Sequence, residues 1–178
     1  MRPVADVWDK LQQHLQGEAH AYAPDQDRPL AGYAGVMGVY AVTALGLGAA
    51  ARLTRRPLPQ PTPWDVTLAA LATHQLGRII AKDPVTSPIR APFTRFEGTS
   101  GPAELAEDVR GDGARKAVGE LISCPFCIGM WIATGFTAGS VFAPRATRLV
   151  TATFATLGLS DLLQFARVRA QHAAEEDT

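Results

Sequence analysis

Long uncharged stretches alternate with charged segments along this chain, and four of the stretches predict helices. Pro29–Ala51 contains 23 residues without a charge, and Leu121–Pro144 contains 24. A helix needs about 20 apolar residues to cross a bilayer, so both are predicted transmembrane helices. Trp64–Ala81 and Leu149–Ala166 are interrupted by charged residues and predict two further hydrophobic helices. The pattern predicts an all-α integral membrane bundle of about four hydrophobic helices, with burial of the second and fourth in a globular domain as the alternative.

The flanking segments have compositions of their own. Residues 52–63 are rich in proline and predict an extended connector between the first span and a membrane core over residues 64–166. Residues 98–113 are rich in glycine and predict a mobile loop, and residues 167–178 predict a polar tail that is frayed from residue 172. Residues 1–28 predict an amphipathic helix at a membrane surface, because apolar side chains recur at helical spacing: Val4, Val7, Trp8, Leu11 and Leu15.

The averages over the whole chain conceal this segregation. The 178 residues include 17 basic and 17 acidic residues and are 47% hydrophobic, values that suit one soluble domain. A neutral balance provides no basic face for nucleic acid, and two cysteines are too few for a secreted disulfide scaffold. We therefore expect the lipid bilayer, and no nucleic acid, as a partner.

Basic residues predict the side of the membrane that each segment faces. With four crossings and both termini on one side, that side carries 12 Lys and Arg residues and the other side carries 5. A three-crossing alternative, in which residues 64–81 dip into the bilayer and the N-terminus lies outside, gives the same totals. Both topologies place residues 78–120, the cysteines and the C-terminus in the cytoplasm. The sequence thus predicts a multi-pass protein of the cell membrane with a cytoplasmic C-terminus.

Both cysteines lie together, in Cys124-Pro125-Phe126-Cys127. Pro125 suits the first position of a helix, which makes Cys124 the N-cap and places Cys127 on the same face. Free amides and the positive end of the helix dipole favour a Cys124 thiolate. In a redox interpretation Cys124 attacks and Cys127 resolves, as in the Cys-Pro-Tyr-Cys site of the glutaredoxin–thioredoxin fold, which the tetrapeptide resembles. Reducing pools in the cytoplasm weaken that interpretation.

Two other interpretations of the pair stay open. As metal ligands, the thiolates of Cys124 and Cys127 suit zinc or iron and need about two more ligands, from His74, Glu120 or Asp161, or from a second copy in a homo-oligomer. As structural residues, the cysteines only pack at the helix start. We predict a non-enzymatic membrane protein whose cysteine pair binds a metal or stabilises an assembly. A membrane thiol–disulfide oxidoreductase is the alternative.

Charged residues near the predicted helix ends mark a second candidate site. Arg78, with His74 one turn deeper, approaches the same cytoplasmic layer as Asp161 and Cys124. Charges inside a membrane span are costly and are typical of ion pairs or functional sites. We predict an Arg78–Asp161 ion pair with the cysteines nearby; snorkelling of both side chains to water is the alternative.

The segment that follows the second hydrophobic helix combines basic and aromatic side chains. Arg90, Phe93 and Arg95 follow Asp83. Such a segment suits an anionic lipid surface. A docking surface for a partner, with Arg90 paired to Asp83, is the alternative.

Several of these residues occur in an order that resembles a known family. They are Leu76-Gly77-Arg78, Arg90-Ala91-Pro92-Phe93, and the two cysteines followed by Trp131. Over Trp64–Ala166 the chain resembles the bacterial membrane proteins of domain-of-unknown-function family 1360. The resemblance implies a core of about three helices, so Pro29–Ala51 is an extra N-terminal span and the four-crossing topology is favoured. It implies no activity.

Overall fold

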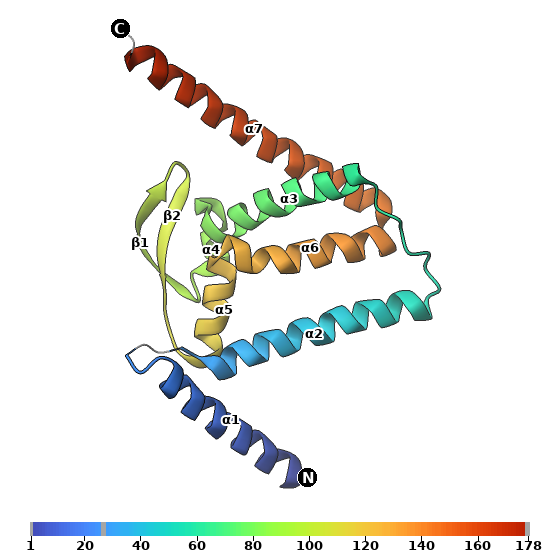
Figure 1. Ribbon diagram of the computed structural model, residues 1–178, viewed down its shortest axis with the longest axis vertical. Coiled ribbons are helices and arrows are strands. Elements are labelled where there is room, and N and C mark those ends of the chain that lie inside the picture. Colours follow the sequence, from blue (N-terminus) through green and yellow to red (C-terminus); the bar gives the residue numbers. More distant parts are fainter. Residues whose placement is uncertain (1, 26–27, 177–178) are drawn as a thin grey trace.

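The computed structural model describes residues 2–25 and 28–176, and most of them are helical (Figure 1). A β-hairpin of two strands interrupts the helices. In chain order the elements are α1 (Arg2–Tyr22), α2 (Leu30–Leu53), α3 (Pro63–Lys82), the 3₁₀ turn η1 (Pro84–Thr86), α4 (Ser87–Arg90), β1 (Thr94–Gly101), β2 (Glu104–Val109), α5 (Gly113–Ser123), α6 (Pro125–Phe142) and α7 (Pro144–Glu176).

The long helices lie beside one another, and the hairpin lies at one of their ends. Figure 1 shows α2, α6 and α3 with their axes roughly aligned, α3 in the opposite direction to the other two. α7 passes along α3 and continues beyond it. The hairpin, α4 and α5 gather at the end where α3 finishes and α6 begins. The connector between α2 and α3 and the junction of α6 with α7 lie at the opposite end.

Small residues allow the helices to approach closely. Ala72 and Ala81 of α3 and Ala155 of α7 are buried. A Cβ atom added at Gly77 of α3 would lie 3.2 Å from the carbonyl oxygen of Pro125 in α6. Close backbone packing through small side chains is typical of helices that associate in lipid.

Three of the described helices are long and apolar enough to cross a membrane by length and composition: α2, α6 and α7. Their large apolar side chains include exposed ones, such as Leu45 of α2 and Leu163 of α7. α3 is not among the three, and its own residues Asp65, Arg78 and Lys82 lower its hydropathy. A crossing by α3 stays a prediction.

The start of α6 confirms the expected capping at Cys124. A residue that precedes proline is pushed out of the helical region, and Cys124 has φ −107° and ψ 111°. Its Sγ accepts a hydrogen bond from the Cys127 amide at 3.2 Å. The uncharged stretch Leu121–Pro144 is therefore not one helix, because its first three residues end α5.

The predicted loop over residues 98–113 is wrong, since most of it belongs to the hairpin. β1 and β2 pair antiparallel, from Thr94 with Val109 to Gly101 with Glu104. Ala103 takes φ +58° in the tight turn that joins them. The all-α fold class is thus correct for the long helices and wrong for this two-stranded sheet.

The two flanking segments gave different outcomes. α1 confirms a helix in the N-terminal segment. The connector predicted over residues 52–63 is extended only over residues 56–62, because α2 continues to Leu53 and α3 begins at Pro63. The frayed C-terminal tail is wrong, because α7 continues as a helix to Glu176. The last two residues of the predicted tail, 177 and 178, lie outside the described residues.

Candidate functional site

The cysteine pair lies at the first turn of α6, at the hairpin end of the molecule. Both thiols are free; Cys127 is exposed and Cys124 is partly exposed. The two side chains contact each other by a hydrogen bond. Phe126, between them in sequence, leaves 93% of its surface exposed. The pair is thus accessible to a ligand or to another chain.

The additional metal ligands expected from the sequence do not join the cysteines. Among the described residues, no group of three or more His, Cys, Asp and Glu side chains comes together. Glu120 instead accepts a hydrogen bond from Tyr33 and faces Arg28, while Asp161 faces Arg78. The Cys124–Cys127 pair has two sulfur atoms, which is half the number of ligands in a tetrahedral set.

Arg78 links three elements at the same end of the molecule. Its guanidinium lies 3.6 Å from Asp161 of α7, which is the ion pair expected from the sequence. It also donates to Glu104 of β2, at 2.7 Å from Nη2 and 3.1 Å from Nε. Gln75, which is buried, donates to the Asp161 carboxylate at 2.8 Å. The position of this cluster inside a bilayer, with His74 in the same layer, stays a prediction.

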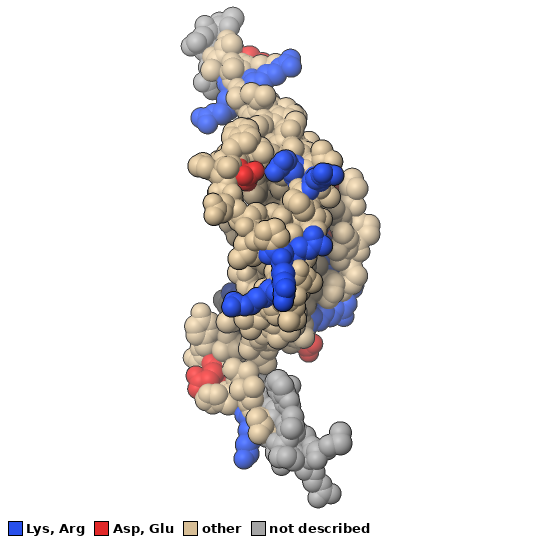
Figure 2. All heavy atoms as spheres, turned by 90° about the vertical axis from the view of Figure 1, so that its right-hand side faces the viewer, with Lys and Arg blue, Asp and Glu red and all other residues tan. Residues whose placement is uncertain are grey.

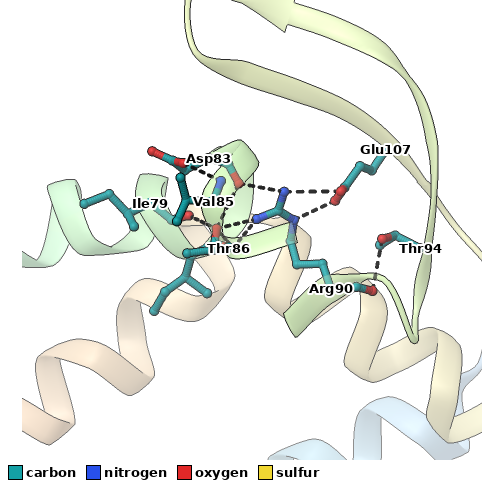
Figure 3. A network of polar contacts seen from close by, with 8 residues as sticks. Ile79, Asp83, Val85, Thr86, Arg90, Thr94 and Glu107 are labelled. Carbon is teal, nitrogen blue, oxygen red and sulfur yellow. Dashed lines mark hydrogen bonds and ion pairs between the residues drawn. The ribbon is translucent and has the colours of Figure 1, made fainter. Parts of the chain in front are cut away.

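Arg90 forms the most buried polar network of the described residues (Figure 3). Its side chain is 0% exposed and makes a two-pronged ion pair with Glu107 of β2, with distances of 2.6 and 3.2 Å. It also donates to the Ile80 carbonyl, the Thr86 hydroxyl and the Asp83 carbonyl, at 2.7, 2.7 and 3.1 Å. The single guanidinium therefore fastens the hairpin to the end of α3.

This burial corrects one prediction. Arg90 does not lie on a lipid or partner surface, and its carboxylate partner is Glu107 rather than Asp83. The Asp83 carboxylate instead caps η1 by accepting from the Val85 amide at 2.8 Å. Arg95 is exposed, and Phe93 and Asp83 are partly exposed, so these three can still face such a surface.

Two further arginines hold the Ala91-Pro92-Phe93 segment. Arg110 donates through Nη2 to the Ala91 carbonyl at 2.7 Å, and Arg115 donates through Nε to the Pro92 carbonyl at 3.0 Å. These bonds satisfy carbonyl groups that belong to no helix or strand. The segment is therefore held by the part of the chain that follows the hairpin.

The hairpin end of the molecule, with the residues described above from α3 to α7, lies within one segment that matches a known protein family. A family model described as a protein of unknown function, DUF1360, matches residues 68–167, more than half of the chain. The chain belongs to this family. The matched DUF1360 region contains the Arg78 cluster, the Arg90 network and both cysteines.

One curated relative of this DUF1360 chain is named after a biological process. The sporulation protein YjcA of Bacillus subtilis is 28% identical over 102 residues, which cover 56% of this chain and 86% of the relative. No solved structure shows a significant match to the chain.

α2 lies outside the matched DUF1360 region and attaches to it by specific contacts. The Tyr33 hydroxyl donates to Glu120 of α5, and the hydroxyl of Tyr40 lies 2.9 Å from that of Thr134 in α6. The Tyr40 ring meets Trp131 edge-on, with centroids 5.2 Å apart. Tyr33 also raises the pKa of the neighbouring Arg28 guanidinium, by a hydrogen bond. These contacts join the extra N-terminal helix to α5 and α6.

Sequence reasoning missed several of these residues. Glu104 and Glu107 lay in the predicted loop, and no alternation of polar and apolar residues marked them as strand positions. Gln75 and Tyr33 lay inside apolar stretches, where single polar side chains gave no indication of a partner. The glutamates would have been suspected only if the burial of Arg90 had been known, because a buried arginine needs a carboxylate.

Proposed function

We propose that this chain is a non-enzymatic multi-pass membrane protein whose cytoplasmic face carries the hairpin, the cysteine pair and the C-terminus. The support is the presence of three helices long and apolar enough to cross a membrane, with α3 as a fourth between α6 and α7. α3 runs antiparallel to α6 and in the same general direction as α7, as two inward crossings would (Figure 1). The segments that this topology assigns to the side of the hairpin carry 12 Lys and Arg residues in the sequence, and the segments assigned to the other side carry 5, which favours a cytoplasmic hairpin. Because the Bacillus subtilis relative is named a sporulation protein, spore formation is the first process to examine.

The opposite end of the helices is the predicted outer face. Figure 2 views the molecule from that side and shows Lys and Arg side chains gathered there with little acid. The five basic residues of this end are all exposed, and they lie in the last turn of α2, in the connector after it and in the first turns of α7: Arg52, Arg55, Arg56, Arg145 and Arg148. The difference in Lys and Arg residues between the two sides of a membrane sets the orientation of the helices. Labelling from one side of the membrane therefore tests the proposed topology directly.

Thiol labelling tests the topology with the native cysteines. We expect a membrane-impermeant maleimide to label Cys127 only after the cells are permeabilised in the presence of a chelator. A cysteine-free variant with Thr62→Cys in the connector serves as the matched control and should be labelled in intact cells. Labelling of Cys127 in intact cells would contradict the proposed orientation.

For the cysteine pair we infer a metal-bridged assembly. The observation that carries this inference is the accessible pair of contacting free thiols without a third ligand among the described residues. Zinc and iron bind four thiolates tetrahedrally, so two copies of the pair complete one site. Each bound ion would then join two chains at the membrane surface.

Metal content and oligomeric state test this inference together. Protein purified in mild detergent is expected to contain about 0.5 zinc or iron per chain and to be a dimer. Cys124→Ser should lose both the metal and the dimer. Ser123→Ala is the matched control, because the Ser123 hydroxyl has no hydrogen-bond partner in the described part of the chain. A metal-free monomeric wild type would refute the assembly.

The position of Cys124 at a helix start supports a second candidate, a thiol–disulfide oxidoreductase. The Cys124 thiolate would attack a substrate disulfide and form a mixed disulfide. Cys127 would then attack the Cys124 sulfur, so the substrate leaves as a dithiol and the protein is oxidised to a Cys124–Cys127 disulfide. Mass spectrometry tests this candidate after the protein is equilibrated in a glutathione buffer set to the redox potential of the cytoplasm. The oxidoreductase requires a measurable fraction of protein with the Cys124–Cys127 disulfide, which has two hydrogens fewer than the dithiol form.

A further inference from the structure

A groove runs between α3 and α6 on the side of the molecule away from α2. It encloses about 1140 Å³ and extends from the connector at one end to Lys82 and Phe126 at the other. Small side chains of the two helices form its walls: Ala69, Ala70 and Thr73 of α3, and Gly129, Ala133 and Thr137 of α6. Its middle is therefore apolar along the proposed membrane helices, while the connector end is also lined by the start of α7 and carries Asp65 and Arg148.

The hairpin end of the groove is polar. Arg78, Glu104, His74 and Lys82 line it. Arg78 forms ion pairs with both Glu104 and Asp161. Lys82, the last residue of α3, forms no ion pair within the described ranges 2–25 and 28–176. The ammonium group of Lys82 is the charge that this end offers to a ligand.

The exposed Phe126 ring adds an interfacial feature at the same end. The apolar Phe ring suits the acyl and ester region just below the headgroups, and lysines near helix ends extend to the headgroups themselves. The order from the groove interior to this end is thus apolar wall, aromatic ring and cation. An anionic phospholipid has the complementary order of acyl chain, ester region and phosphate.

We propose that this groove binds one acyl chain of an anionic glycerophospholipid, with the headgroup phosphate at Lys82. The proposal rests on the membrane placement proposed above but not on the cysteine pair. A helix from a second copy is the competing occupant, since small residues also favour helix contacts. The unpaired cation at the end of the groove favours the lipid, because an apolar helix offers Lys82 no counter-charge.

Retention of lipid by the purified protein tests the proposal. The full chain is reconstituted into nanodiscs of equal parts phosphatidylglycerol and phosphatidylcholine, transferred to mild detergent, and examined by native mass spectrometry. One Lys near an anionic headgroup contributes about 1 kcal/mol, so we expect about a fivefold preference for phosphatidylglycerol in the retained lipid. Lys82→Gln should abolish the preference, and Lys82→Arg should keep it.

Two further variants make the result specific to the groove. Arg167→Gln removes an exposed cation from the same end of the molecule outside the groove and should leave the preference unchanged. Ala133→Trp fills the groove and should reduce retention of both lipids, with circular dichroism showing that the helices persist. Equal retention of the two lipids by the wild type, or equal effects of Lys82→Gln and Arg167→Gln, would overturn the proposal. An Ala133→Trp variant that changes oligomeric state but not lipid retention would assign the groove to a second copy instead.

Discussion

Removal of the Glu107 charge should release the hairpin from α3. Glu107→Gln keeps the size of the side chain but leaves the Arg90 guanidinium, at 0% exposure, without its counter-charge. Breaking a buried ion pair at one partner costs about 3–5 kcal/mol. Total stability of a domain is only about 5–15 kcal/mol, so this loss is a large fraction of it. The three oxygen acceptors from residues 80–86 still hold Arg90 in the variant. The contact that is weakened is therefore the one between Arg90 and β2, and the hairpin is the part expected to open.

Amide hydrogen exchange followed by mass spectrometry measures this loss where it occurs. With 1.4 kcal/mol per factor of ten, a cost of about 3 kcal/mol predicts at least a 100-fold faster exchange of β1 and β2 in Glu107→Gln. Asp108→Asn is the matched control, because the neighbouring Asp108 is exposed and should alter exchange little. Equal exchange of the hairpin in the two variants would refute the reasoning that Arg90 and Glu107 hold it.

Three smaller changes test other contacts. Gly32→Ala would place a Cβ 2.7 Å from a carbonyl oxygen of α5. In thermal unfolding this variant should lose about 1–3 kcal/mol of stability, whereas Gly35→Ala, whose Cβ meets open space, should not. Ala103→Gly should slow hairpin exchange severalfold, because Ala103 holds a positive φ that glycine adopts freely. Tyr40→Phe should cost about 1 kcal/mol by removing the hydrogen bond to Thr134, and unchanged unfolding would show that bond to be dispensable.

The sequence was a good guide to the helices because their signals are local. Uncharged stretches of membrane length gave α2 and most of α6, and the Cys124-Pro125 step gave the start of α6. The Arg78–Asp161 contact followed from helix spacing, since both residues lie near the same end of neighbouring helices. Periodicity and proline chemistry act within a few residues of sequence, so one chain is enough to recognise them.

The hairpin could not be predicted because its determinants are distant or atypical. Its turn uses Pro102-Ala103 instead of the Asn-Gly or Asp-Gly pairs that mark tight hairpins, and its strands shift register near Gly98. What stabilises the hairpin is an arginine in a preceding helix, paired across 17 residues of sequence. A tertiary contact of this kind leaves no periodic pattern, which is why Arg90 was expected at a surface.

The continuity of α7 sets a length scale for the C-terminus. Its 33 residues rise about 1.5 Å each and make a rod of about 50 Å, while the hydrocarbon core of a bilayer is about 30 Å thick. In the proposed topology the first turn of α7, with Arg145 and Arg148, lies on the outer side, and the ten residues from Arg167 to Glu176 extend about 15 Å beyond the hydrocarbon on the cytoplasmic side. The charged residues from Arg167 onward would therefore be presented to the cytoplasm on a stiff extension, at a set distance and direction, and not on a chain free to lie back on the lipid.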